Sequence, residues 1–197
     1  MATLSSELDA VNSMLGHIGE MSINSLSDEA TLPMSASTAL NVLREVSKEV
    51  QSEGWHFNTL PEVTLSPNVS NEIELPTNIL LVDANDSTID TVQRGNRLFD
   101  RKNNTFTFTK DIKTSQIILL DWTDLIEQAR RYITLKASRI FQGRMIGSKA
   151  LTDLIARDEF NARADLTEAD SRTSDRTIFD SYDVAARIGI NRNYDIN

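Results

Sequence analysis

The side chains with the clearest chemical potential in this sequence are its carboxylates. The 197 residues include 29 acidic ones, and two carboxyl groups held about 5–10 Å apart suffice to hydrolyse a glycosidic bond. Glu72 and Glu74 would share one face of a predicted strand, whereas the neighbours Asp158 and Glu159 would point apart on a helix. So many acids produce such pairs by chance, and we interpret both pairs as solvated surface.

Other catalytic chemistry lacks the residues it needs. His17 and His56 are the only histidines, and neither has the spacing of a metal motif such as H-E-x-x-H. There is no cysteine and no glycine-rich phosphate loop. We therefore predict no catalytic residue, no cofactor and no metal site. The lack of cysteine and of a secretory N-terminus favours assembly in a reducing cytoplasm, and no apolar run is long enough for a membrane span.

Helical periodicity marks both ends of the chain. Apolar residues recur every three or four positions over about 5–18, 35–53, 124–147 and 148–173, which predicts four amphipathic helices. Gly54 follows the second of them, where a left-handed residue commonly ends a helix. The residues of the fourth helix that we expect to face inward are Leu151, Leu154, Ile155, Ala162 and Leu166.

The period changes to that of β-strands between residues 57 and 122, which also hold three of the four prolines. Residues 71–76 and 104–109 alternate as half-buried strands do, and the apolar runs 79–84 and 115–122 suit strands buried on both faces. Asn103-Asn104 predicts a hairpin turn, since asparagine tolerates positive φ.

The predicted fold is therefore α+β. A bundle of about four helices, built from residues 1–56 and 123–176, would carry a small antiparallel β module, residues 57–122, inserted between helices two and three. Trp55 and Phe57 lie at the entry to this insert and Trp122 lies at its exit. Because both ends must meet to rejoin one bundle, we expect these aromatics to seal a structural joint; a ligand pocket is the alternative.

Charge is distributed unevenly along the chain, whose net charge is −9. Such a protein is unsuited to wrapping nucleic acid, because phosphate binding needs clustered basic residues. The first 54 residues are acidic, whereas the third helix is basic. Two explanations stand equal: copies contact head to side, as in a ring, or the charges neutralise each other within one bundle. The first makes these candidate assembly contacts: Arg130, Arg131, Arg139 and Arg144.

Four segments together resemble a known family. They are "ELDAVNSMLGHIGE", "EVQSEGWHFNT", "LFDRKNNTFTF" and "YITLKASRIFQGRMIG". Over roughly residues 4–170 the chain resembles the tail tubular protein A family of short-tailed, podovirus-type bacteriophages. The opening motif, the Gly-Trp joint and the third helix are the most specific parts, whereas the β module matches loosely and the C-terminal segment departs from the pattern.

The resemblance implies a structural adaptor in the virion tail. Proteins of this family form a twelve-membered ring between the portal protein and the nozzle, tail tubular protein B; they help retain packaged DNA, form part of its exit channel without binding it specifically, and support the tail fibres. The helical bundle with a β module suits the family's fold. The alternative is a tail-associated glycan hydrolase that acts on the host envelope or capsule.

The C-terminal segment, residues 177–197, is too apolar for a solvated linker and too irregular for a self-sufficient helix or strand. It either folds back on its own bundle or serves as a docking arm that becomes ordered on a neighbouring subunit or the portal, and we favour the docking arm. Its candidate contact residues are Phe179, Tyr182, Ile188 and Tyr194.

Overall fold

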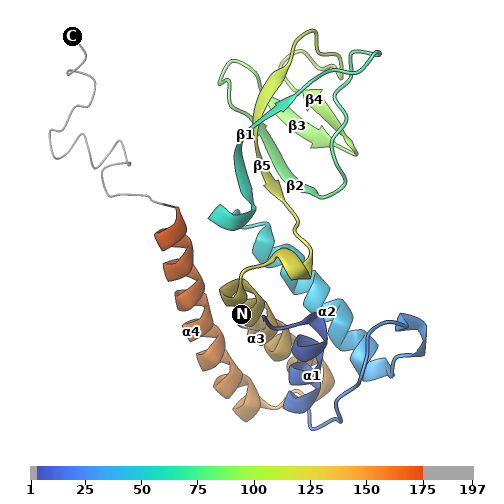
Figure 1. The fold of residues 1–197 in the computed structure, drawn as a ribbon, viewed down its shortest axis with the longest axis vertical. Coiled ribbons are helices and arrows are strands. Elements are labelled where there is room, and N and C mark those ends of the chain that lie inside the picture. Colours follow the sequence, from blue (N-terminus) through green and yellow to red (C-terminus); the bar gives the residue numbers. More distant parts are fainter. Residues whose placement is uncertain (1–3, 175–197) are drawn as a thin grey trace, which may run out of the picture.

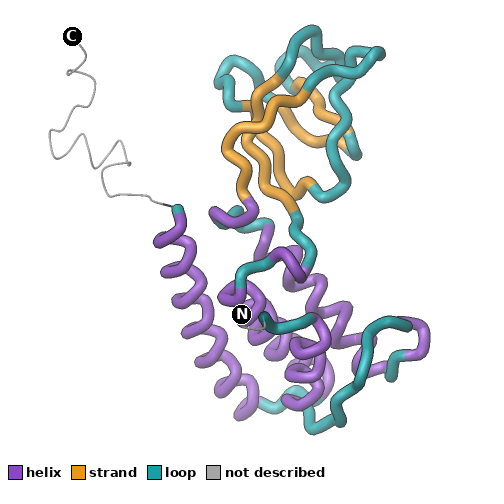
Figure 2. Tube along the Cα trace, in the orientation of Figure 1, coloured by secondary structure: helices purple, strands orange, loops and turns teal. Residues whose placement is uncertain are grey.

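The structure, a computed structural model, describes residues 4–174. Four helices make up the lower part of the molecule in Figure 1: α1 (Glu7–His17), α2 (Met34–Gln51), α3 (Glu127–Met145) and α4 (Lys149–Thr173). Short strands between α2 and α3 form a separate upper part, and only two chain segments connect the two parts (Figure 2). The predicted α+β architecture, with its strands between helices two and three, is confirmed.

Local chemistry explains the start of α1 and the glycine that follows α2. Ser6 caps α1, because its hydroxyl accepts the backbone N–H of Asp9 while the Asp9 carboxylate accepts the Ser6 N–H. Gly54, just after α2, has φ +77°, and a Cβ there would lie 2.6 Å from Cδ1 of Ile117. Both the backbone conformation and the close approach of β5 therefore require glycine.

Helix α3 is the centre of the bundle, since it packs against each of the other three helices. Helix α4 packs mainly against α3 and buries only a narrow stripe, Ile155, Ala162 and Leu166. The expectation that Leu151 and Leu154 face inward is wrong, because these side chains are 36% and 58% exposed. A helix with one neighbouring helix can cover only one narrow face, so an apolar pattern wider than that face stays in solvent.

The β module contains two small sheets. In the first, β5 (Ile112–Ile118) pairs antiparallel with both β1 (Thr59–Leu65) and β2 (Ile79–Ala84), in the order β1-β5-β2. The second is a hairpin of β3 (Thr91–Arg94) and β4 (Arg97–Asp100). Between them lies a second core, distinct from that of the bundle, made of Ile73, Leu75, Ile79, Val82, Leu98, Phe108 and Ile112.

Two of the predicted strands are not strands. Residues 71–76 and 104–109 make only isolated bridges, such as that between Glu72 and Thr107, although Ile73 and Phe108 are buried as the alternation predicts. The prediction that residues 79–84 are buried on both faces is also wrong, since Leu81 is 50% exposed. The turn at Asn103-Asn104 is confirmed: Asn104 has φ +52° and Asp100 bridges to Thr105.

Candidate functional site

Two buried amides connect the bundle to the module. At the end of α2, Gln51 donates from Nε2 to the Leu120 carbonyl at 3.1 Å and accepts the Leu120 N–H on Oε1 at 2.7 Å. Asn58, in the short helix η2 (His56–Asn58), donates from Nδ2 to the Gln51 carbonyl at 2.8 Å and to the Ile118 carbonyl at 2.9 Å. Both side chains are fully buried. Because a buried amide costs free energy when it is unpaired, these bonds hold the entry and exit of the insert in one arrangement.

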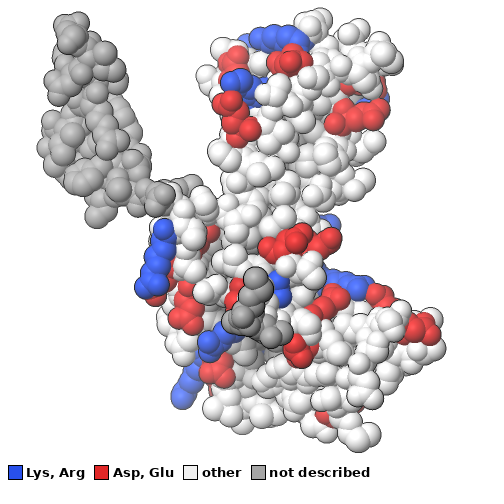
Figure 3. All heavy atoms as spheres, viewed as in Figure 1, with Lys and Arg blue, Asp and Glu red and all other residues white. Residues whose placement is uncertain are grey.

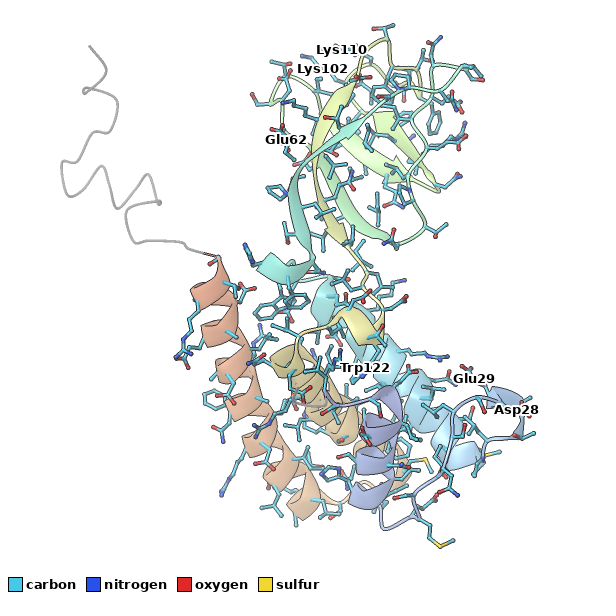
Figure 4. The ribbon with its side chains drawn as sticks, in the orientation of Figure 1. Asp28, Glu29, Glu62, Lys102, Lys110 and Trp122 are labelled. Carbon is cyan, nitrogen blue, oxygen red and sulfur yellow. The ribbon has the colours of Figure 1, made fainter. Side chains whose placement is uncertain are left out.

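The three aromatics lie around this amide pair. Trp55 is 8% exposed and its indole N–H donates to the Val50 carbonyl at 2.8 Å. Phe57 and Trp122 are half-buried and pack against the bundle core. Figure 4 labels Trp122 beside the exit segment, where its indole N–H donates to the Ser5 carbonyl at 2.9 Å. The aromatic set therefore packs on the bundle side of the joint, and the polar pair crosses it.

Arg130 is a third buried polar element of the joint. Its guanidinium donates to the carbonyls of Leu125, Ser5 and Thr123, at 2.9, 2.8 and 2.7 Å, and the residue is 4% exposed. One buried side chain of α3 thus binds both the N-terminal segment and the exit segment of the module that leads into α3. Every one of its partners is a backbone carbonyl of the same chain, so the side chain has an internal structural role in the free subunit.

The other basic residues of α3 also have partners within the chain. Arg144 lies 3.1 Å from Glu45 and Lys136 lies 3.1 Å from Glu49, both on α2. The remaining two bond or approach acids of α4: Arg139 pairs with Glu159, and Arg131 lies 3.9 Å from Asp165. Neutralisation within the bundle, one of the two explanations of the charge pattern, is therefore present in the structure, and Figure 3 shows blue and red side chains interspersed over the bundle.

A groove of about 540 Å³ lies on the surface of the joint, between α1, α2 and the exit segment. It is lined by Glu7, Arg44, Asp121 and Trp122 among others. Glu7 lies 3.3 Å from Arg44, which also binds Glu29 at 2.7 Å. The groove thus holds two carboxylates and an aromatic wall, the elements of a sugar site, but one carboxylate is already engaged with a guanidinium.

The pKa values of four carboxyl groups are lowered by their surroundings, whereas a general acid needs a raised pKa. Hydrogen bonds from Ser6 lower the pKa of Asp9, and the Arg44 guanidinium lowers the pKa of Glu29. The pKa of Asp86 is lowered by the Thr88 hydroxyl, and that of Asp100 by the backbone N–H of Asn103. A glycosidase needs a carboxylic acid that keeps its proton near neutral pH, and these environments favour the charged form.

The remaining residues singled out in the sequence lie apart from one another. His56 is exposed, and its backbone N–H donates to Asp170 at 2.7 Å. Glu72 binds Arg97 at 2.7 Å, on the β module. Over residues 4–174 no group of three or more possible ligands could hold a metal ion. The candidate contacts Phe179, Tyr182, Ile188 and Tyr194 lie outside the described residues.

A family model described as tail tubular protein matches residues 8–176, which include both the bundle and the module. The chain belongs to the tail tubular protein family. No curated protein matches it. As a tail tubular protein it is a structural component of the bacteriophage virion tail, and its family suggests assembly with other tail components. Within the described part of this tail tubular protein, no helix is long and apolar enough to cross a membrane.

The polar residues that connect the segments at the joint are Gln51, Asn58 and Arg130. The sequence predicted no role for the two amides. It predicted an assembly contact for Arg130. A signal was present for the amides: they are the Gln and the Asn of the Gln-x-x-Gly-Trp-x-Phe-Asn stretch that carries the family resemblance. Arg130 had no such signal. Its neighbour Arg131 is exposed, and one position along a helix decides which of them points into the core.

Proposed function

We propose that this protein is a ring-forming adaptor between the portal and the nozzle of the phage tail. The observation that carries the proposal is its family membership together with the division into two hydrophobic cores. An adaptor must present different surfaces to different partners. A bundle at one end and a β module at the other supply two such surfaces, and the paired amides fix how one lies relative to the other.

In this proposal copies of the chain form a ring, a dodecamer in the virion, that contacts the portal protein, tail tubular protein B and the tail fibres. Assembly takes place in the host cytoplasm. Arg131 is the candidate assembly contact on α3 that is most available, since its side chain is 61% exposed and its acidic partner is 3.9 Å away. Arg130, Arg139 and Arg144 would act in assembly only through their present partners or by exchanging them.

The net charge supports a role in which the protein lies beside DNA without binding it. Each chain carries −9, so a ring of copies would be strongly negative. A negative wall repels phosphates and lets DNA slide during ejection. The ring would therefore help to retain the genome by closing the channel and not by binding the nucleic acid.

Imaging by negative stain, with the protein mixed with its portal, tests the proposal. We expect rings of copies stacked on one face of the portal, and an Arg131→Glu variant should form fewer of them. Arg101→Glu, on the β module and equally exposed at 61%, is the matched control for a change of surface charge. Protein that stays monomeric beside the portal at every concentration would contradict the adaptor role.

The segment 177–197 is part of this proposal as the arm that docks onto a neighbouring subunit or the portal. Deleting these residues should leave a folded chain that no longer attaches to the portal. A deletion variant that unfolds would instead make the segment part of the core. Circular dichroism distinguishes these outcomes before any binding measurement is made.

A glycan hydrolase is the second candidate, and the joint groove with Glu7, Asp121 and Trp122 is the observation that favours it. We expect at most weak cleavage of host polysaccharide and no turnover of phosphoesters or peptides. A robust rate that disappears in Asp121→Asn, but persists in Asp124→Asn three residues away, would establish the hydrolase and overturn a purely structural role.

A further inference from the structure

Helix α4 is the least buried helix of the bundle. Three of its 25 residues are buried, against four of 11 in α1, nine of 18 in α2 and eight of 19 in α3. It packs mainly against α3. Elements with few buried apolar contacts open at a lower free energy than the core of a protein does. Separation of α4 from α3 is therefore the opening of the bundle that exposes the fewest buried residues.

The second half of α4 is nevertheless bound to the segment that enters the β module. The Arg163 guanidinium donates to both carboxylate oxygens of Glu53, at 3.1 and 2.8 Å, and to the Tyr132 hydroxyl at 2.9 Å. It also lies 5.8 Å from the ring centre of Trp55. A bidentate pair of this kind fixes orientation as well as distance. Arg163 thus attaches α4 to two residues, Glu53 and Trp55, that come just before the module.

Asp170 binds the same segment slightly further along the chain. Its carboxylate accepts the backbone N–H of His56, the first residue of η2, at 2.7 Å. The first N–H groups of a helix have no partner within that helix, so Asp170 supplies an acceptor from another one. The last residue of η2 is Asn58, whose amide binds the carbonyls of Gln51 and Ile118. The short helix η2 is therefore bound by α4 at its start and by the joint at its end, and the C-terminal end of α4 lies beside it in Figure 1.

The two ends of α4 are attached by different chemistry. At its first turn, the fully buried Gln142 of α3 donates to the Ser148 carbonyl at 3.2 Å and accepts the Thr152 hydroxyl at 2.9 Å. At the module entry the side chains of the ion pair are partly exposed, Arg163 by 46% and Glu53 by 33%. A partly exposed ion pair adds little net stability, whereas a buried amide is costly to leave unpaired. The second half of α4 should therefore separate more easily than its base.

We propose that α4 is a releasable brace of the joint. Docked on α3, its second half, residues 163–173, holds η2 and with it the entry of the β module. When this half is released, the module is held less firmly while α1, α2 and α3 stay folded. A tail component that binds one of these two states more tightly would thereby set how firmly the module is held. The inference does not depend on the adaptor proposal, because it concerns the isolated chain.

Hydrogen exchange of the full-length chain tests the brace from the side of α4. Leu166 is fully buried, so Leu166→Ala weakens the packing of α4 on α3. This variant should speed the exchange of amides in 163–173 and also in 56–60 several-fold, while the amides of α1 and α3 keep their protection. The matched control is Leu154→Ala on the same helix, since Leu154 is 58% exposed, and it should change neither region.

A second pair of variants tests the coupling without a core substitution. Arg163→Leu removes the contacts with Glu53 and Tyr132, and it should speed the exchange of amides in 56–60 several-fold. Arg172→Leu is its control, because Arg172 pairs with Glu168 inside α4, and it should leave 56–60 unchanged.

The reverse experiment starts from the joint. Coupling between two sites is reciprocal, so a change that loosens the joint must also loosen the second half of α4. Asn58→Ala removes the amide that binds both ends of the insert. It should speed the exchange of amides in 163–173 several-fold and leave those in 149–156 unchanged.

Any of four results would overturn the proposal. The first is unchanged exchange in 56–60 of Leu166→Ala, whether or not α4 itself exchanges faster. The second is a Leu166→Ala chain in which α1 and α3 lose protection together with α4, since the helix would then be an integral part of the bundle. The third is an equal effect of Arg163→Leu and Arg172→Leu on 56–60. The fourth is an Asn58→Ala variant in which the two halves of α4 respond equally or not at all.

Discussion

The helical bundle and the β module are held together by different physical means. The bundle cluster contains 20 buried apolar residues, among them large ones such as Phe141, Leu43 and Ile133. The module cluster contains 7 within the described chain. Burial of apolar area is the main favourable contribution to folding, so the bundle has the larger reserve of stability. The module has the smaller core and therefore the smaller reserve of stability.

Local polar contacts supplement the small core of the module. The Asn68 side chain accepts the backbone N–H groups of Ser70 and Glu72 at 2.9 and 3.1 Å. Arg94 stacks over Phe99, 3.6 Å from the ring centre, and Phe99 meets Phe106 edge to face. Such contacts stabilise particular turns but bury little area. The module therefore depends more on its turns and its attachment for its shape, whereas the bundle depends on its core.

The largest effect should come from removing the buried aromatic on the bundle side of the joint. Trp55→Ala should lower the free energy of unfolding by about 3–5 kcal/mol, because it deletes a large buried side chain at the joint. Thermal denaturation followed by circular dichroism measures the loss. Phe160→Ala, whose ring is 75% exposed on α4, is the control and should change little. Equal melting of Trp55→Ala and the natural protein would contradict the structural role of the joint.

A core substitution in the module should separate the two regions. Leu98 is fully buried in the module cluster, and Leu98→Ala should cost about 3 kcal/mol through the cavity it leaves. Hydrogen exchange of β3, β4 and β5 should accelerate strongly while α2 and α3 keep their protection. If protection falls equally in both regions, they unfold as one unit and the comparison fails.

Acid should weaken the module through the turn at Asp100. The N–H of Asn103 lowers the pKa of the Asp100 carboxyl, so its contribution is present above the unfolded-state pKa, near 4, and is lost as the pH falls through the lower folded-state value. Asp100→Asn should remove about 1 kcal/mol at pH 7 and flatten this part of the acid dependence. Denaturation of both proteins between pH 7 and pH 2 provides the measurement; parallel curves would count against it.

The smallest effects should come from the ion pairs on the bundle surface. The side chains of Arg144 and Glu45 are 51% and 62% exposed, and Arg144→Ala should cost at most about 0.5 kcal/mol, less in high salt. Arg163→Ala should cost more, since Arg163 binds both Glu53 and the Tyr132 hydroxyl. Urea denaturation at low and high salt compares the two variants. A larger loss of unfolding free energy in Arg144→Ala than in Arg163→Ala would contradict this order.

The sequence predicted the helices and the insertion well, because these depend on periodicity over many residues. The stripes of α1, α2 and α3 were read from spacing alone, and Gly54 marked the end of α2 through the demands of its backbone. The same periodicity predicted that Leu151 and Leu154 are buried, but both are exposed. Periodicity shows which face is apolar, but the number of neighbouring helices decides how much of that face is covered.

The β module was predicted less well at the level of its strands. Alternation at 71–76 correctly placed Ile73 and Leu75 inside, yet ladder formation depends on whether a partner runs alongside, which spacing does not encode. The strands β1 and β3 were not singled out. The sequence analysis singled out aromatic residues for the joint and did not single out Gln51 or Asn58, since a buried Gln or Asn has the same sequence appearance as an exposed one.

The attachment of the module by two neighbouring strands has a mechanical consequence. Both β1 and β5 leave the bundle at the same end of their ladder, where Thr59 pairs with Ile117, and the amides of Gln51 and Asn58 hold these ends together. A pull on the far tip of the module therefore loads both strands in parallel and does not slide one past the other. A twisting force on the module likewise acts on two paired strands and not on a single connection. The module should transmit a push or a twist to the bundle as a short stiff lever.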